Sequence, residues 1–289
     1  MTFRFLAVVI ALLLVAFVPQ VRTWRDLRWF DHWIVQCGNV RGVGRLLLVL
    51  APPVIVVAIV AALLGSAYWL TLVWLAFAVA VLVYTLGPRN LEADIGAVLA
   101  SEGLVERAHA AQALRVHTDD DAVLSLRPAA LVEASVCSAL KRRFGVVLWF
   151  VVLGPAGALL YRLAQHLGDH ADTDVDSRSA ARRFADIMDW PAAHLMVFAM
   201  ALVSDFDAVI GTWRAWHKSP NRSPWTFDAG FLGAVARAGV EADVEAGDDG
   251  APDTDNPMLE LLDARRLLLR VLLVWLAVLA LLVLAGWVA

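Results

Sequence analysis

Residues 46–86 read LLLVLAPPVIVVAIVAALLGSAYWLTLVWLAFAVAVLVYTL and carry no charged side chain. Two apolar runs, 46–64 and 67–86, are separated only by Gly65 and Ser66. As an α-helix, each run is long enough to cross about 30 Å of hydrocarbon. Two residues leave room only for a tight turn, so we expect two transmembrane helices packed antiparallel.

The whole chain has the composition of a membrane protein. Sixty per cent of its 289 residues are hydrophobic and 18% are charged, a balance that a water-soluble core cannot absorb. Further apolar runs lie at residues 3–18, 146–163, 192–210 and 267–288. The sequence therefore predicts an all-α, polytopic integral membrane protein with about six transmembrane helices, in one domain over residues 1–289.

The charges exclude some classes of partner and predict an orientation. The net charge of −4 and the lack of a basic stripe argue against nucleic acid. The two cysteines, Cys37 and Cys137, have no metal-ligand spacing, so no metal and no cofactor is expected. With six spans, nineteen of the 24 Lys and Arg residues fall on one side of the bilayer. Positive loops stay in the cytoplasm, so the long connections are predicted inside and both termini outside, in the inner membrane of a bacterium.

Three connections on the predicted cytoplasmic side are long: residues 22–45, 87–144 and 211–266. Residues 87–144 hold two helical stretches with amphipathic character, the second beginning at Pro128. Residues 240–257 are rich in Asp, Glu, Gly and Pro, and this composition predicts a flexible acidic linker.

Three acidic positions, Glu133, Asp205 and Asp207, are candidates for a site because they lie beside apolar segments. Glu133 falls on the apolar stripe of the 128–144 helix, where a carboxylate needs a partner or has a function. Ser135 and Ser138 are expected on the opposite, wetter face. Asp205 and Asp207 stand at the expected end of the 192–210 span, where helix carbonyls disfavour negative charge.

The run 146–163 contains Gly154, Pro155 and Gly157 at its middle and ends in Tyr161 and Arg162. Proline removes a backbone donor and glycine permits close helix approach. Two interpretations remain open: a kinked crossing, or a re-entrant segment that returns to the side where it began.

These residues also carry a resemblance to a known family. The stretches Leu131–Val136 and Arg143–Leu163, with Met188-Asp189-Trp190-Pro191 and Ser204-Asp205-Phe206, resemble the signature regions of the AmpE regulators of β-lactamase induction. His194 departs from the arginine expected there. The AmpE group in turn resembles the CbiB/CobD membrane proteins of cobalamin synthesis, and Ser219-Pro220-Asn221 is similar to a motif of those enzymes.

The resemblance implies an inner-membrane signalling modulator that links cell-wall recycling to β-lactamase induction, without catalytic residues of its own. Its implied partners are the lipid bilayer and a cytoplasmic amidase-pathway protein or a muropeptide-type ligand. One alternative is a corrinoid amide-forming synthase of the CbiB/CobD type, and another is a small-solute transporter. The expected ligand-binding residues are Glu133, Tyr161, Arg162, Asp205 and Asn221, with Gly154, Pro155 and Gly157 as a structural motif.

Overall fold

A computed structural model describes residues 2–18, 26–38, 42–66, 68–86, 90–115, 124–169, 175–219, 227, 229–245 and 257–286. All regular structure within these ranges is helical, as the sequence predicts. The elements follow one another in the order α1 (Thr2–Phe17), α2 (Arg28–Gln36), α3 (Gly42–Gly65), η2 (Tyr68–Leu70), α4 (Thr71–Thr85), α5 (Leu91–Ala100), α6 (Leu104–Gln112), α7 (Pro128–Ala139), η3 (Leu140–Phe144), α8 (Gly145–Leu153), α9 (Pro155–Asp169), α10 (Val175–Val203), α11 (Phe206–His217), α12 (Phe231–Glu245) and α13 (Pro257–Leu284).

The helices form two compact units. Unit 1 comprises residues 1–90, 145–188 and 279–289, and unit 2 comprises residues 91–144 and 189–278. Helices α10 and α13 each contribute to both units.

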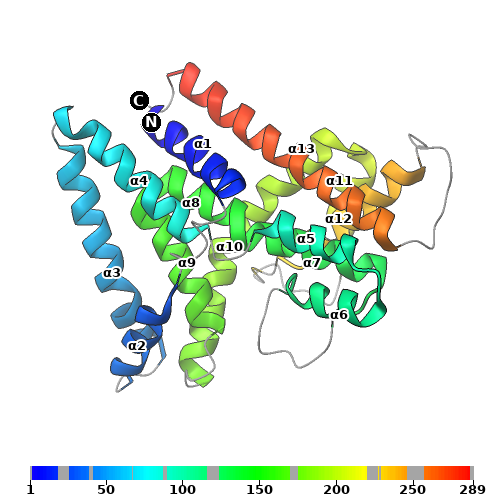
Figure 1. Cartoon of the computed structure of the whole chain (residues 1–289), viewed down its shortest axis with the longest axis horizontal. Helices are drawn as coiled ribbons and strands as arrows, with labels where there is room; N and C mark the ends of the chain where they lie inside the picture. The colour runs from blue at the N-terminus through cyan, green and yellow to red at the C-terminus, as the bar shows by residue number, and fades with distance from the viewer. Residues whose placement is uncertain are drawn as a thin grey trace. The chain divides into compact units, whose positions relative to one another are not determined.

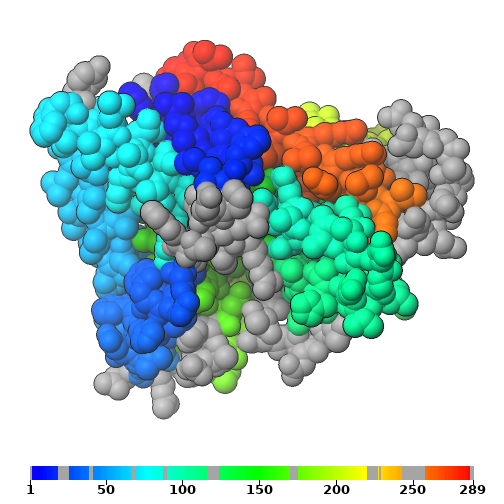
Figure 2. Space-filling model, in the orientation of Figure 1, coloured from blue at the N-terminus to red at the C-terminus, as the bar shows by residue number. Residues whose placement is uncertain are grey.

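In unit 1, α4 packs against α1, α3 and α9, and α9 also packs against α3 and α8. The α3–α4 pair is the hairpin expected from residues 46–86 (Figure 1). Many α3 side chains have no protein cover: Leu47, Val56 and Leu63 are each about 60% exposed. The outer surface that α3 and α4 present is visible in Figure 2. Apolar side chains exposed in this number indicate lipid as their solvent.

Among the described residues, three helical segments are long and apolar enough to cross a bilayer: α3, α10 and residues 258–284 of α13. Helices α1 and α4 are apolar but shorter. A membrane protein is therefore supported, while the count of six crossings and the orientation remain predictions.

A continuous helix over residues 146–163 is not observed. The run divides at Gly154 into α8 and α9, which pack against each other. The expected span over 192–210 is also placed differently, since its helix begins at Val175, ends at Val203 and is followed by a separate helix from Phe206. Gly154 is the single residue between α8 and α9, whereas Ser204 and Asp205 separate α10 from α11, where Asp205 has the extended backbone of an N-cap.

In unit 2, α7 packs against α5 and α12, and α12 also packs against α11. Glu133 is exposed, whereas Ser135 and Ser138 are buried, so the faces expected for this helix were wrong. The reason is that neighbouring helices cover α7 on more than one side, and small serines permit that approach. The Ser135 hydroxyl is satisfied within the helix by donating to the Leu131 carbonyl at 2.7 Å.

The 87–144 connection and the predicted acidic linker are each described in part. Residues 87–144 contain α5, α6, α7 and η3, while residues 116–123 lie outside the described part. Of the predicted acidic linker, residues 240–245 belong to α12, and residues 246–256 are not described.

Candidate functional site

The α8–α9 hairpin holds the Gly154–Arg162 motif in unit 1. Gly154 has φ of +73°, a left-handed conformation that ends a helix and favours glycine. Pro155 then opens α9, where its missing N–H costs nothing. The chain reverses over this single residue, so α8 and α9 form a helical hairpin.

Two glycines set the distance between α8 and α9. A Cβ placed on Gly157 would lie 2.3 Å from the Trp149 carbonyl oxygen, and one placed on Gly145 would lie 2.2 Å from the Tyr161 hydroxyl. Residues 145 and 161, and residues 149 and 157, are therefore opposite one another, as in an antiparallel pair centred near Gly154. Tyr161 is fully buried in this seam.

Arg4 of α1 holds the tip of the hairpin. Its Nη1 donates to the carbonyl oxygens of Val151 at 2.9 Å and Val152 at 3.3 Å. These belong to the last turn of α8, where carbonyls lack helical partners and a cation is favourable. Arg4, the charged residue of the apolar helix α1, is thus bonded to the end of α8. The sequence alone did not reveal this partner.

Farther along α9, Arg162 is half-buried and His166 bonds to another helix. The Nε2 of His166 lies 2.6 Å from Oδ1 of Asp31 in α2. At the start of α2, the backbone N–H of Arg28 donates to Asp26, and this hydrogen bond lowers the pKa of the Asp26 carboxyl. The contact between His166 and Asp31 thus joins α2 to the α8–α9 hairpin through polar groups.

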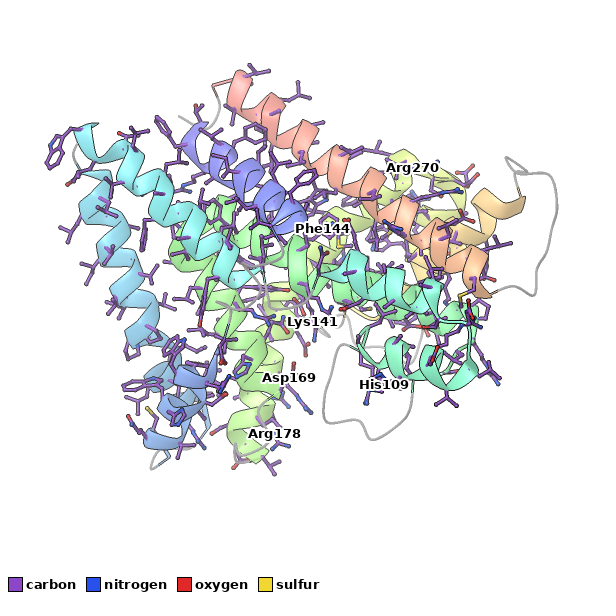
Figure 3. All side chains as sticks on the ribbon, viewed as in Figure 1. His109, Lys141, Phe144, Asp169, Arg178 and Arg270 are labelled. Carbon is purple, nitrogen blue, oxygen red and sulfur yellow. The ribbon has the colours of Figure 1, made fainter. Side chains whose placement is uncertain are left out.

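The basic run Lys141-Arg142-Arg143 lies on a turn of π-helix, η3. Figure 3 marks Lys141 and Phe144 on this segment. Arg142 Nη1 contacts Asp94 Oδ2 at 2.6 Å, and Arg143 Nη1 contacts Glu92 Oε1 at 3.1 Å. Single π-helical turns cluster at functional positions.

Arg142 and Arg143 are equally exposed, at 16% each, but Arg142 has the more buried carboxylate partner. The Asp94 side chain is 17% exposed. A second nitrogen of Arg142, Nη2, donates to the Ala113 carbonyl at the end of α6. The sequence interpretation missed Glu92 and Asp94, although both lie in the first turn of α5, where carboxylates are favourable.

Glu133 and Gly233 are in direct contact across α7 and α12. A Cβ on Gly233 would lie 2.4 Å from Glu133 Cγ and 2.7 Å from Cδ. The absence of a side chain at Gly233 thus leaves the space that the Glu133 side chain occupies. The Glu133 residue as a whole is nevertheless exposed.

Asp205 is the N-cap of α11. Its Oδ1 accepts a hydrogen bond from the Ala208 N–H at 2.7 Å, and Asp207 lies in the first turn. Both carboxylates are favourable at a helix start, so the electrostatic conflict inferred from the sequence does not exist. The adjacent Ser204 hydroxyl donates to the Gly239 carbonyl of α12 at 3.0 Å.

The expected site residues fall into three groups. Glu133 and Asp205 belong to unit 2, Tyr161 and Arg162 belong to unit 1, and Asn221 lies outside the described residues. Both members of the first group adjoin α12: Glu133 lies against Gly233, and Ser204 next to Asp205 lies against Gly239. Gly233 and Gly239 are six residues apart, so these two contacts lie about 9 Å apart along α12. A single site containing all five residues remains a prediction.

These features define a helical membrane protein. It has an α8–α9 hairpin packed at Gly145 and Gly157, and a paired-charge cluster made of Arg142 with Asp94 and Arg143 with Glu92. The chain is 30% identical over 179 residues to the cobalamin biosynthesis protein CobD of Chromobacterium violaceum. This similarity covers 56% of the present chain and 55% of that protein, so the chain spans about half the length of the curated relative it matches. No protein-family profile matches the sequence, and no solved structure matches it.

Proposed function

We propose that this protein is a membrane-embedded, non-catalytic signalling modulator of the AmpE type, which couples cell-wall recycling to β-lactamase induction. The proposal rests on the resemblance of residues 131–163 to that family. The CobD similarity is compatible with it, because AmpE proteins themselves resemble the CbiB/CobD group.

The observation that carries the non-catalytic part is the burial of Tyr161. Its side chain is fully buried against Gly145, so its position serves the packing of α8 on α9. Asp205 likewise has a capping role. Among the described candidates, Glu133 is an exposed acidic residue, which suits recognition of a ligand or partner.

The second candidate is an amide-forming synthase of the CobD type, and the similarity to CobD favours it. Two sequence departures count against that activity. Residues Ala164-Gln165-His166-Leu167 replace the Asn-Thr-Leu-Asp run that the enzymes have after Tyr-Arg, and Arg222-Ser223 replaces Ala-Gly after Ser-Pro-Asn.

The proposed partner is a muropeptide-type ligand or an amidase-pathway protein, on the cytoplasmic side of a bacterial inner membrane. A muropeptide carries hydroxyl and amide groups that donate hydrogen bonds to a carboxylate such as Glu133.

A deletion strain separates the two candidates. We expect deletion to change β-lactamase induction by at least threefold while cobalamin synthesis stays normal. Reintroducing the Gly233→Ala variant should fail to restore induction, because its new methyl group displaces Glu133. The matched Gly211→Ala variant should restore it, since a Cβ there meets nothing within 4 Å.

Membrane levels of both variants are compared by immunoblotting, so that loss of protein is distinguished from loss of function. Normal induction together with cobalamin auxotrophy in the deletion strain would refute the signalling proposal and support the synthase. Full restoration by stably produced Gly233→Ala would refute the role of Glu133.

A further inference from the structure

A cluster of aromatic and imidazole rings in unit 2 has no part in the hairpin or in the paired-charge cluster. It is built by three elements: α10, α11 and α12. Its central members are Trp190, His194, Trp213, His217 and Phe231. Two histidines from different helices therefore lie within one cluster.

Both histidines are held in the same way. The Nδ1 of His194 lies 2.8 Å from the Trp190 carbonyl oxygen, and the Nδ1 of His217 lies 2.8 Å from the Trp213 carbonyl oxygen. Because a carbonyl oxygen only accepts, each Nδ1 must carry the hydrogen. In the neutral ring this leaves the Nε2 lone pair free, as in many histidines that bind metals.

The separation of the two rings is compatible with one shared ion. Their centres are 5.8 Å apart. Metal–nitrogen bonds of about 2.0–2.1 Å place the centres of two ligating imidazoles roughly 5–6 Å apart.

Aromatic neighbours restrict the movement of both imidazoles. The centre of the His194 ring is 4.2 Å from that of Trp190 and 4.6 Å from that of Phe231. The His217 ring is 4.9 Å from Trp213. Restricted rings lose little conformational freedom when they bind an ion. His217 is exposed and His194 is half-buried, so an ion reaches the pair from outside the helices.

We propose that His194 and His217 form a two-histidine site for a divalent transition-metal ion, with water completing its coordination. Neutral imidazoles suit Cu²⁺, Zn²⁺ and Ni²⁺, and Cu²⁺ binds most tightly of the three. Within the described ranges no group of three or more His, Cys, Asp or Glu side chains is placed to hold a metal. The site is therefore an open, exchangeable one, and it is independent of the proposed signalling role.

The test is a titration of the purified full-length protein, free of any histidine tag and held in detergent micelles, with Cu²⁺ alone. We expect one Cu²⁺ per chain, an electron paramagnetic resonance spectrum with hyperfine structure from two nitrogen nuclei, and quenching of tryptophan fluorescence. Either His194→Ala or His217→Ala should raise the Kd at least tenfold.

His109→Ala is the control, because His109 is an exposed histidine on α6 (Figure 3). It should leave the Kd unchanged. His217→Asn provides a second variant at the exposed position, where folding is least affected. Binding that persists unchanged in the His217 variants, or a wild-type spectrum with fewer than two coupled nitrogens, would overturn the proposal.

Discussion

Replacing Gly157 with alanine is expected to lower the free energy of unfolding by about 2–3 kcal/mol, in the range of overpacked interiors. The new methyl group would lie 2.3 Å from the Trp149 carbonyl oxygen and 2.4 Å from Leu153 Cβ. A backbone oxygen cannot rotate away as a long side chain can, so α8 and α9 must separate. The measurement is an SDS or thermal unfolding curve in detergent micelles.

Gly96→Ala is the matched control for this substitution. Gly96 also lies inside a helix, α5, but a Cβ at that position meets nothing within 4 Å. Alanine has the higher helix propensity, so we expect this variant to be more stable by up to about 1 kcal/mol. Equal responses at the two positions would show that α8 and α9 are not in close contact.

Replacing Arg142 with alanine has the second large expected effect, a loss of about 3 kcal/mol in the free energy of unfolding. The substitution leaves Asp94 largely buried without its cation and removes the donor to the Ala113 carbonyl. Breaking a buried pair from one side costs more than the pair itself contributes, because the remaining charge is not compensated. The same unfolding assay measures this change.

The control pair is Arg266 and Asp263, which join at 3.1 Å and are 53% and 27% exposed. Arg266→Ala should cost less than about 0.5 kcal/mol, because an exposed pair is screened by water. The double variant Arg142→Met with Asp94→Leu should recover a large part of the lost stability. If Arg142→Ala and Arg266→Ala have the same effect, the cluster on η3 has no special structural role.

The length and lack of charge of two apolar runs were sufficient to predict the α3–α4 hairpin. Its two apolar runs are uninterrupted, and a gap of two residues permits only one packing arrangement. The all-helical class follows from the same physics, since lipid requires every backbone group to be bonded within its own segment.

The α8–α9 hairpin could not be decided from sequence because Gly154 and Pro155 suit both a kink and a reversal. What distinguishes them is tertiary: Gly145 faces Tyr161, and Gly157 faces Trp149. The members of each pair lie at equal distances along the chain on either side of a common centre next to the turn. The sequence contains this spacing, but only the structure shows that the paired residues are in contact.

The roles of the charged residues required knowledge of helix ends and partners. Asp205 is unfavourable in a single helix over residues 192–210, but it is favourable as the N-cap of α11, which begins at Phe206. Arg142 pairs with a carboxylate 48 residues away. Neither hydrophobic periodicity nor local spacing selects that partner from the 28 acidic residues of the chain.

The reversal at Gly154 is the central structural claim, because it decides both the path of the chain and the surroundings of Tyr161 and Arg162. Spin labels on cysteines introduced at Leu148 and Arg162 test it directly, in a background with Cys37→Ala and Cys137→Ala. A continuous helix separates these two Cα atoms by about 21 Å. Neighbouring antiparallel helices, with axes about 8–10 Å apart, bring them to about 11 Å. We expect strong dipolar broadening of the continuous-wave spectrum in lipid nanodiscs. A spectrum without broadening, as expected near 21 Å, would contradict a reversal at Gly154.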